Sequence, residues 1–358
     1  MRNKLKSVNI KFSPKKLYYP PRWIVLGVNN VCNLHCKMCD VGTKNVTSNF
    51  AQNLVGTHPM NMPVNLFKKV VDQCKQFAPQ AKLGYAFTEP LVYPHLEETL
   101  AYADKNGMFT SITTNALNLR KHSQVLSETG LNELYISLDG LEETHNYIRG
   151  HKSSFQRAIV GIEAVLSQKN PAKIGVYCVV TNWNQHELVE FVKYFQQFPL
   201  KEIAFMHPNF TPQTLADEHN LLWSAEYPAT ASNLDEFNPA DFNLKALWKE
   251  IQNVRSIKSK FPVFFAPELD SEHSLDVFYN KPKVFIGKGC QDVFHNLMIK
   301  SDGSVIPAHG RCYNLKVGNL HDTSLKSIWN STVFSKFRKD LKKSNGYLPA
   351  CSRCCSAF

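Results

Sequence analysis

The chain has 358 residues, more than one hydrophobic core comfortably holds, which predicts one large domain with a smaller one. Apolar residues make up 43% and charged residues 20%, and this composition excludes a wholly disordered chain. The formal net charge of +11 favours anionic partners without choosing among nucleic acid, phosphorylated metabolites and anionic lipid.

Residues 1–22 form a basic N-terminal extension. Six Lys and Arg side chains and no acid occupy residues 1–16, and we interpret them as a solvated tail in preference to a nucleic-acid-binding arm. The segment lacks the apolar stretch of a secretory signal. No part of the chain reaches the roughly 18 uncharged apolar residues of a membrane helix. We therefore expect a cytoplasmic protein.

The next motif is a run of three cysteines after an apolar strand. Residues 23–30 read as the strand, and Cys32, Cys36 and Cys39 follow in the run CNLHCKMC. Ten cysteines in a chain without an export signal favour metal binding or catalysis over disulfides. Structural zinc and electron-transfer clusters use four protein ligands, whereas three thiolates leave one iron of a 4Fe–4S cluster open to a small molecule. A zinc knuckle or chance clustering is the alternative.

Strands and helices then alternate as far as residue 220. A helix is predicted over 62–77, with apolar residues on one stripe, and further strands over 82–87, 108–113, 133–138, 173–180 and 202–207. Six such βα units imply a parallel sheet with helices outside it. In barrels built this way, the chemistry lies at the C-terminal ends of the strands.

After residue 208 the alternation weakens. Residues 226–282 read as a linker containing a helix near 241–260, and a small module follows over 283–358. The module has a hairpin signature around residues 301–304 and a helix near 324–343. Four of its cysteines fit either a zinc ion or a fully ligated 4Fe–4S cluster: Cys290, Cys312, Cys351 and Cys354, with Cys355 as an alternative last ligand.

Two segments carry a family resemblance. The spacing of Cys32, Cys36 and Cys39 resembles that of the radical SAM superfamily, and DGSVIP…GNL…SLKSIW resembles the SPASM/twitch extension of such enzymes. The resemblance implies an α/β fold: a partial (β/α)6 TIM-like radical SAM barrel over 23–225 with a small C-terminal α+β twitch/SPASM-like cluster domain. It also implies three cofactors. These are S-adenosylmethionine (SAM), a SAM-binding 4Fe–4S cluster on the first three cysteines, and an auxiliary 4Fe–4S cluster on the later four. In this family, SAM is cleaved to a radical that abstracts hydrogen from the substrate.

The resemblance further assigns SAM contacts to the strand ends. Residues 87–90 (FTEP) resemble the family's GGEP element, and residues 113–116 (TTNA) resemble TTNG, with glycines replaced in both. Arg149 resembles the arginine that pairs with the SAM carboxylate, which a guanidinium can hold bidentately. The expected SAM-binding residues are Met38, Thr88, Glu89, Asn115, Ser137, Asp139, Arg149 and Asn182, with Thr181 and Asn184 as alternatives to Asn182.

The sequence does not single out a catalytic residue. Cys178, His207 and Arg311 are candidates, and His151 and His309 could also lie near the substrate. Cys178 lies in the middle of a predicted strand, where a core position is favoured over a hydrogen-donating one.

We expect an enzyme that oxidises or rearranges a small polar metabolite, an anionic one being an option, with an electron donor such as flavodoxin or ferredoxin. A peptide maturase acting on a ribosomally made precursor is the alternative. A third class, a non-enzymatic iron–sulfur or zinc protein on nucleic acid, would show affinity that falls steeply with salt. The strand-end motifs argue against it, so nucleic acid is not an expected partner.

Overall fold

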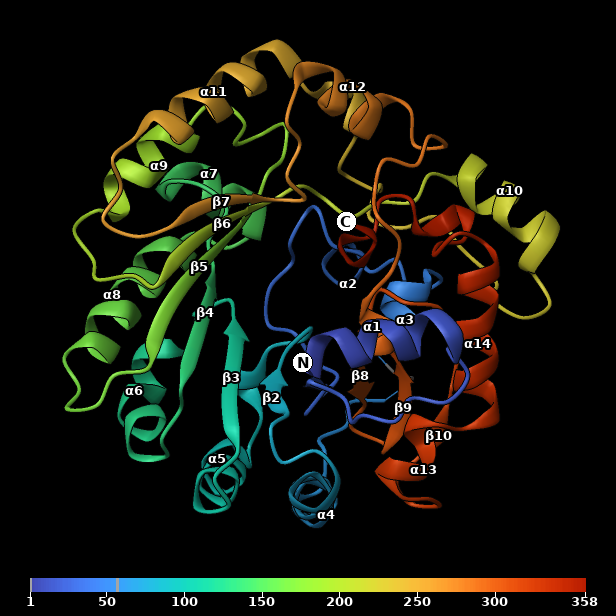
Figure 1. Ribbon diagram of the computed structural model, residues 1–358. Helices are drawn as coiled ribbons and strands as arrows, with labels where there is room; N and C mark the ends of the chain where they lie inside the picture. The colour runs from blue at the N-terminus through green and yellow to red at the C-terminus, as the bar shows by residue number, and fades with distance from the viewer. Residues whose placement is uncertain (1, 56–57) are drawn as a thin grey trace.

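A ten-stranded sheet, curved into an open barrel with helices on its outer side, carries the fold (Figure 1). The computed structural model describes residues 2–55 and 58–358. The strand order is β10-β9-β8-β1-β2-β3-β4-β5-β6-β7, parallel from β8 through β7 and antiparallel across β8, β9 and β10. The strands are β1 (Trp23–Leu26), β2 (Lys82–Tyr85), β3 (Phe109–Thr114), β4 (Glu133–Ser137), β5 (Lys173–Val179), β6 (Glu202–Met206), β7 (Val263–Ala266), β8 (Asn296–Ile299), β9 (Ser304–Pro307) and β10 (Gly318–Asn319).

The helices that follow the parallel strands bury one apolar stripe each. In α4, for example, Phe67, Val70, Val71 and Cys74 are buried, as the spacing predicts. The helices are α1 (Arg2–Phe12), α2 (Asp40–Thr43), α3 (Asn49–Leu54), α4 (Val64–Phe77), α5 (Leu96–Lys105), α6 (Leu119–Glu128), α7 (Glu142–Arg149), α8 (Ser154–Leu166), α9 (Leu188–Phe195), α10 (Gln213–Trp223), α11 (Leu244–Ser256), α12 (Glu272–Asn280), α13 (Leu325–Trp329) and α14 (Thr332–Lys343). Short 3₁₀ turns are η1 (Pro90–Val92), η2 (Pro239–Asp241), η3 (Asp292–Phe294), η4 (Pro349–Cys351) and η5 (Cys355–Ala357).

The six predicted βα strands are confirmed as β1 to β6, and the parallel α/β fold with them. Two features go beyond the prediction. β7 comes from the segment interpreted as a linker and pairs with β6, and β8 of the C-terminal hairpin pairs in parallel with β1. The C-terminal module is therefore hydrogen-bonded into the same sheet as the barrel.

The helix predicted near 324–343 is two helices. Ser331 begins the second of them, because its side chain accepts a hydrogen bond from the backbone N–H of Phe334 and so caps α14. α13 ends at Trp329, whose indole N–H donates to the carbonyl of Tyr19. The chain between the two helices is thereby tied to the N-terminal extension.

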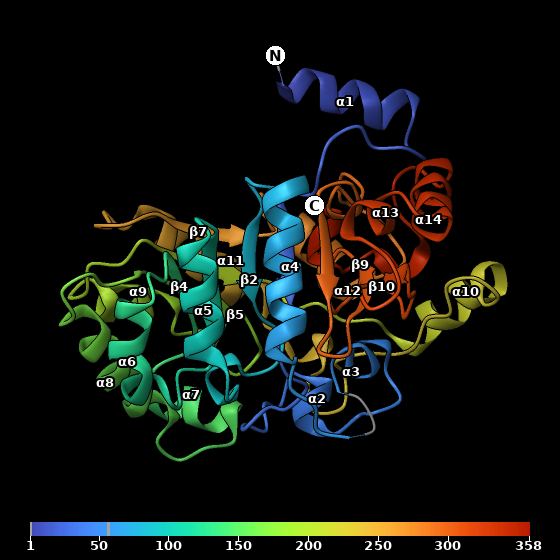
Figure 2. The same ribbon diagram turned by 90° about the horizontal axis from the view of Figure 1, so that it is seen from below.

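The N-terminal extension lies against the C-terminal module. Asn330 bonds both the N–H and the carbonyl of Leu17, which is 3% exposed. Figure 2 shows α1 outside the barrel, on the side of the molecule where α14 lies. Among the described residues, no helix combines the length and the apolar character needed to cross a lipid bilayer.

Candidate metal and cofactor sites

The first three cysteines lie in the loop that follows β1, at the C-terminal edge of the sheet. Cys36 is buried, Cys39 is half-buried and precedes α2, and Cys32 is exposed. Burial raises the pKa of the Cys36 thiol to about 12, while the Arg149 guanidinium opposes the rise. Binding iron here would therefore release protons from the thiols.

Gly42 lets α2 fold back onto this loop. A Cβ at Gly42 would overlap the backbone nitrogen and oxygen of Cys36, so any side chain there would displace the loop. The close approach holds the backbone of Cys36 against α2, which begins directly after Cys39. Three thiols within eight residues suit an iron–sulfur cluster with one iron free of protein.

The loops after β1, β2 and β3 are hydrogen-bonded to one another through Glu89. Its buried carboxylate accepts bonds from Thr114 Oγ1 at 2.6 Å, from the Leu91 N–H at 2.9 Å and from the Asn115 N–H at 2.8 Å. Burial raises the pKa of Glu89, and these donors oppose the rise. Glu89 therefore fixes the relative positions of the strand-end loops.

Thr88 and Asn115 extend this network to the cysteine loop. Thr88 Oγ1 donates to the carbonyl of Asn29 at 2.9 Å, and Asn115 Nδ2 donates to Asn33 Oδ1 at 2.8 Å. The two predicted residues thus hold the segment that begins the cysteine run.

Two of the three positions where glycine is replaced have a left-handed backbone. Phe87 has φ +81° and Ala116 has φ +61°, a conformation that costs roughly 1–3 kcal/mol in a residue other than glycine. The Phe87 ring stacks on His309, with ring centroids 5.5 Å apart, and so reaches from β2 to the C-terminal module.

Arg149 lies between the first cysteine group and Asp139. Its Nη2 atom is 2.6 Å from Asp139 Oδ2, and its Nη1 atom is 3.7 Å from Cys36 Sγ. Arg149 Nε is buried and has no hydrogen-bond partner among the described residues. Asp139 is fully buried and accepts a bond from the Val179 N–H at 2.8 Å. An unpaired buried N–H beside the cysteine loop fits an anionic ligand such as the SAM carboxylate.

The remaining predicted SAM contacts lie around the same edge. Met38 packs beside Cys36 and Leu117, and Ser137 ends β4. Asn182 has a buried Oδ1 without a partner among the described residues. Its neighbour Asn184 instead bonds the carbonyls of Asp139 and Val179 and so joins two strand ends.

The catalytic candidates are dispersed. Cys178 is fully buried in the main core, and His207 is buried with Nδ1 2.7 Å from the Tyr279 hydroxyl. Burial lowers the pKa of His207 to about 3. His151 lies in a turn, where its Nδ1 accepts the Ser153 N–H. Only Arg311 and His309 line the cavity of the C-terminal module described next.

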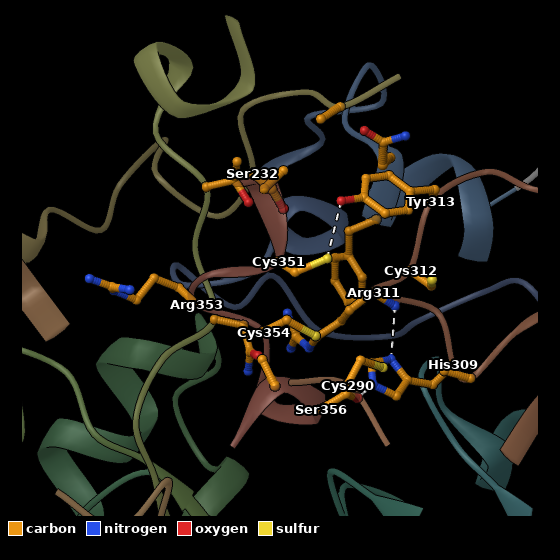
Figure 3. Close-up of a pocket in the computed structure, with 18 of the residues that line it drawn as sticks. Ser232, Cys290, His309, Arg311, Cys312, Tyr313, Cys351, Arg353, Cys354 and Ser356 are labelled. Atoms are coloured by element: carbon orange, nitrogen blue, oxygen red, sulfur yellow. Dashed lines mark hydrogen bonds between the residues drawn. The ribbon is translucent and has the colours of Figure 1, made fainter. Parts of the chain in front are cut away.

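The cysteines Cys290, Cys312, Cys351 and Cys354 line one cavity of about 80 Å³ (Figure 3). Burial raises the pKa of the first three thiols, and the Tyr313 hydroxyl lies 3.2 Å from Cys351 Sγ. Four thiols converging on one buried space fit a fully ligated metal centre.

Arg353 anchors the terminal CxxC pair. Its guanidinium is 1% exposed and donates to the carbonyls of Val277, Phe278 and Lys281 at the end of α12. A helix C-terminus offers such unpaired carbonyls, and a cation is favourable there. The loop between Cys351 and Cys354 is thereby held at a fixed place.

Cys355 lies beside His309. The ligand atoms of His309, Cys354 and Cys355 all lie within 4.8 Å of one another. However, His309 Nδ1 accepts the Arg311 N–H, so the neutral ring carries its proton on Nε2, 2.6 Å from Ser356 Oγ. His309 is therefore oriented as a donor to Ser356, whose hydroxyl donates to Asp292.

Sequence reasoning missed the contacts that join the polar segment 209–240 to the first cysteine group. Asp40, directly after Cys39, is fully buried and accepts bonds from Ser232 Oγ and the Asn233 N–H, both at 2.6 Å. Asn53 donates to the carbonyls of Gly310 and Cys312 and so links α3 to the second cysteine group. No local pattern signals contacts between residues this far apart in the chain.

The comparisons with known proteins agree with this geometry. The profile of the radical SAM superfamily matches residues 27–195, and that of the SPASM iron–sulfur cluster-binding domain matches residues 290–355. The first implies a 4Fe–4S cluster and SAM as cofactors, and the second implies auxiliary iron–sulfur clusters.

Two curated relatives carry functional names. The chain is 25% identical to a tungsten-containing aldehyde ferredoxin oxidoreductase cofactor-modifying protein of Pyrococcus furiosus, over 93% of this chain and 87% of that protein. It is 27% identical to an Fe-coproporphyrin III synthase of Methanosarcina barkeri, over 51% of this chain and 43% of that protein.

Solved structures share the fold. Streptococcus suis SuiB bound to its precursor peptide SuiA has a TM-score of 0.63 at 15% identity, covering 99% of this chain and 74% of that one. Native anSMEcpe with bound AdoMet and the Cp18Cys peptide has a TM-score of 0.61 at 18% identity, covering 89% of this chain and 83% of that one. The two profiles therefore show a radical SAM enzyme domain followed by a C-terminal SPASM iron–sulfur cluster-binding domain, and the solved structures share the fold.

Proposed function

We propose that the protein removes a hydrogen atom from a small polar metabolite, anionic at neutral pH, bound between the two cysteine groups. Cys32, Cys36 and Cys39 would hold the SAM-binding cluster, and Cys290, Cys312, Cys351 and Cys354 the auxiliary one. When bound, the first cluster and SAM supply one-electron chemistry that takes hydrogen from carbon. We propose a cytoplasmic setting, because thiols stay reduced there.

The chain's own residues orient and enclose SAM in this proposal. Arg149 holds its carboxylate through the free Nε, while Asp139 fixes the guanidinium plane. Glu89, Thr88 and Asn115 keep the strand-end loops at a constant spacing, and Met38, Ser137 and Asn182 complete the contacts. Preorganised polar groups of this kind need no rearrangement on binding.

The observation that carries the substrate proposal is the set of polar residues beside the second cysteine group. Asn49, Thr230, Ser232 and Arg311 border the cavity that the auxiliary cluster would occupy. Arg311 lies over the Phe50 ring, 4.4 Å from its centroid, and has no carboxylate partner in the part of the chain that the structure describes. A cation with open donors beside neutral polar groups suits a small anionic substrate.

The cluster assignment is tested by iron content and SAM cleavage. Anaerobically reconstituted protein should hold about eight irons per chain and form 5′-deoxyadenosine with dithionite. Cys36→Ala should leave about four irons and abolish that product. Cys74→Ala is the matched control, because Cys74 lies on the buried apolar side of α4. If Cys36→Ala still cleaves SAM, the assignment is wrong.

The substrate class is tested by isotope transfer. Candidate metabolites labelled with deuterium are incubated with enzyme and SAM, and transfer into 5′-deoxyadenosine identifies the target carbon. Arg311→Gln should weaken turnover of an anionic metabolite far more than that of a neutral analogue. Transfer only from a precursor peptide would replace this proposal with peptide maturation.

A further inference from the structure

The positive charge of the chain is concentrated in two segments. Residues 1–22 and 324–346 together contain thirteen Lys and Arg and a single Asp, a net charge of +12. The rest of the chain contains twenty-eight Lys and Arg against twenty-nine Asp and Glu, a net charge of −1. The formal excess of +11 is therefore a property of these two segments and not of the whole surface.

The two segments are neighbours in the fold. Ser335 of α14 donates to the carbonyl of Lys15, and Trp329 donates to the carbonyl of Tyr19. Figure 2 shows α1 and α14 on the same side of the molecule. We define the basic face by the lysines that these segments present: Lys11, Lys15, Lys16, Lys339, Lys342 and Lys343, of which Lys339 is half-buried and the others exposed.

Exposed apolar side chains accompany these lysines. Phe12 is 73% exposed, Val8 51% and Val333 43%. Exposed apolar groups combined with charge suit a protein-binding surface, because the apolar groups give contact and the charges give steering. Exposed apolar side chains would contribute nothing to a surface that binds only phosphate groups.

The inner side of α14 borders the second cysteine group. Phe337 and Leu341 line the cavity of Cys290, Cys312, Cys351 and Cys354. A single helix, about 10–12 Å across with its side chains, therefore separates the basic face from the place where the auxiliary cluster would lie.

A series of packed aromatic rings also connects the basic face with the second cysteine group. The Lys336 ammonium lies 5.3 Å from the centroid of the Tyr227 ring, which lies 4.9 Å from that of Phe337. Phe337 lies 6.0 Å from Tyr313, whose hydroxyl is 3.2 Å from Cys351 Sγ. Packed rings thus connect the outer surface of α14 with a cluster thiol.

We propose that the basic face is the docking site of an acidic one-electron carrier protein, which reduces the auxiliary cluster across α14. One electron leaves the reduced flavin or iron–sulfur centre of the carrier and enters the cluster; no bond forms or breaks. The inference rests on the proposed function, because it requires an auxiliary cluster on the four cysteines. The unequal charge distribution supports an acidic partner.

The test uses the cluster-loaded protein and an acidic flavodoxin in its hydroquinone form. Stopped-flow absorbance gives the second-order rate of flavodoxin oxidation, and freeze-quench EPR against Cys351→Ser shows which cluster is reduced. Lys339→Glu with Lys342→Glu and Lys343→Glu should slow the reaction on the order of 10-fold or more at low salt. Added salt should slow the wild type more than this variant.

The matched control reverses three exposed lysines near α11, on the far side of the molecule (Figure 1). Lys245→Glu with Lys249→Glu and Lys258→Glu changes the net charge equally and should react within about twofold of the wild type. Equal slowing in both variants, or none in the α14 variant, would overturn the proposal. So would a short DNA duplex or anionic vesicles binding the basic face more tightly than flavodoxin at about 0.15 M salt.

Failure of this inference and failure of the proposed function give different results. Dithionite should reduce the clusters of the wild type and both triple variants alike. If the EPR spectrum of the dithionite-reduced protein shows no auxiliary cluster, the proposed function is wrong. If it reduces the cluster but the carrier does not distinguish the variants, only the docking site is wrong.

Discussion

Replacing Arg149 tests a fold contact and a ligand contact at the same time. Its partner Asp139 is fully buried, and the two side chains meet at 2.6 Å. Removing one member of a buried pair leaves an uncompensated charge, so we expect Arg149→Met to lower the free energy of unfolding by about 3–5 kcal/mol. Adding Asp139→Asn removes that charge as well. The double variant should therefore lose about 1–3 kcal/mol less than the sum of the single variants.

The stability readout is anaerobic urea unfolding of the cluster-loaded protein, with the four proteins of the cycle compared at one pH. Contributions that the clusters make equally to the stability of all four proteins cancel when the free energies of unfolding are compared. If the effects of the two substitutions add within about 0.5 kcal/mol, the ion pair does not stabilise the fold and the reasoning fails.

The binding readout is equilibrium dialysis with labelled SAM. Hydrogen bonds to charged groups contribute about 1.5–3 kcal/mol, so Arg149→Met should weaken SAM binding about 10- to 150-fold. Arg149→Lys keeps the charge but not the planar set of donors, and should recover only part of the affinity. Unchanged affinity in a destabilised Arg149→Met protein would refute the carboxylate role and leave the ion pair intact.

Three further results are expected. Gly42→Ala should push the cysteine loop off α2, because its Cβ overlaps the backbone of Cys36, and iron content should fall from about eight to about four per chain while auxiliary-cluster absorbance remains; full iron loading would contradict the close approach. Ala116→Gly should raise the free energy of unfolding by about 1 kcal/mol, since glycine adopts φ +61° without strain; a loss of stability would show that this backbone is unstrained. The folded pKa of His207, about 3, lies below its unfolded value, so the unfolded chain binds the extra proton and stability falls as pH falls below about 6.5. Between pH 6.5 and 5.5, His207→Gln should remove about 1 kcal/mol of that loss relative to wild type, and parallel stability profiles for the two proteins would contradict burial of the neutral imidazole.

The parts of the fold set by short-range patterns could be predicted from the sequence. The run from Cys32 to Cys39 lies within eight residues, and β1 to β6 each follow from an apolar segment between turns. The strand-end residues could be placed because parallel strands all end at one edge of the sheet.

The parts set by long-range contacts could not. Asp40 accepts hydrogen bonds from Ser232 and Asn233, which lie nearly two hundred residues later in the chain. The residues next to Asp40 in the sequence do not indicate these partners. β8 pairs with β1 across some 270 residues of chain, and no hairpin signature encodes that pairing. The sequence predicts a solvated basic tail over residues 1–22, and Lys11, Lys15 and Lys16 are exposed. It could not show that Leu17 and Tyr19 of this segment bond to partners more than three hundred residues away.

The position of β1 has a consequence for how the enzyme matures. One edge of this strand pairs with β2 and the other with β8, which a ribosome makes some 270 residues later. Until then, half of the backbone donors and acceptors of β1 stay open to water or to other chains. If iron were delivered to the nearby cysteines during synthesis, β1 would still lack its partner β8. Shortening the gene before β8 would therefore damage both metal centres together.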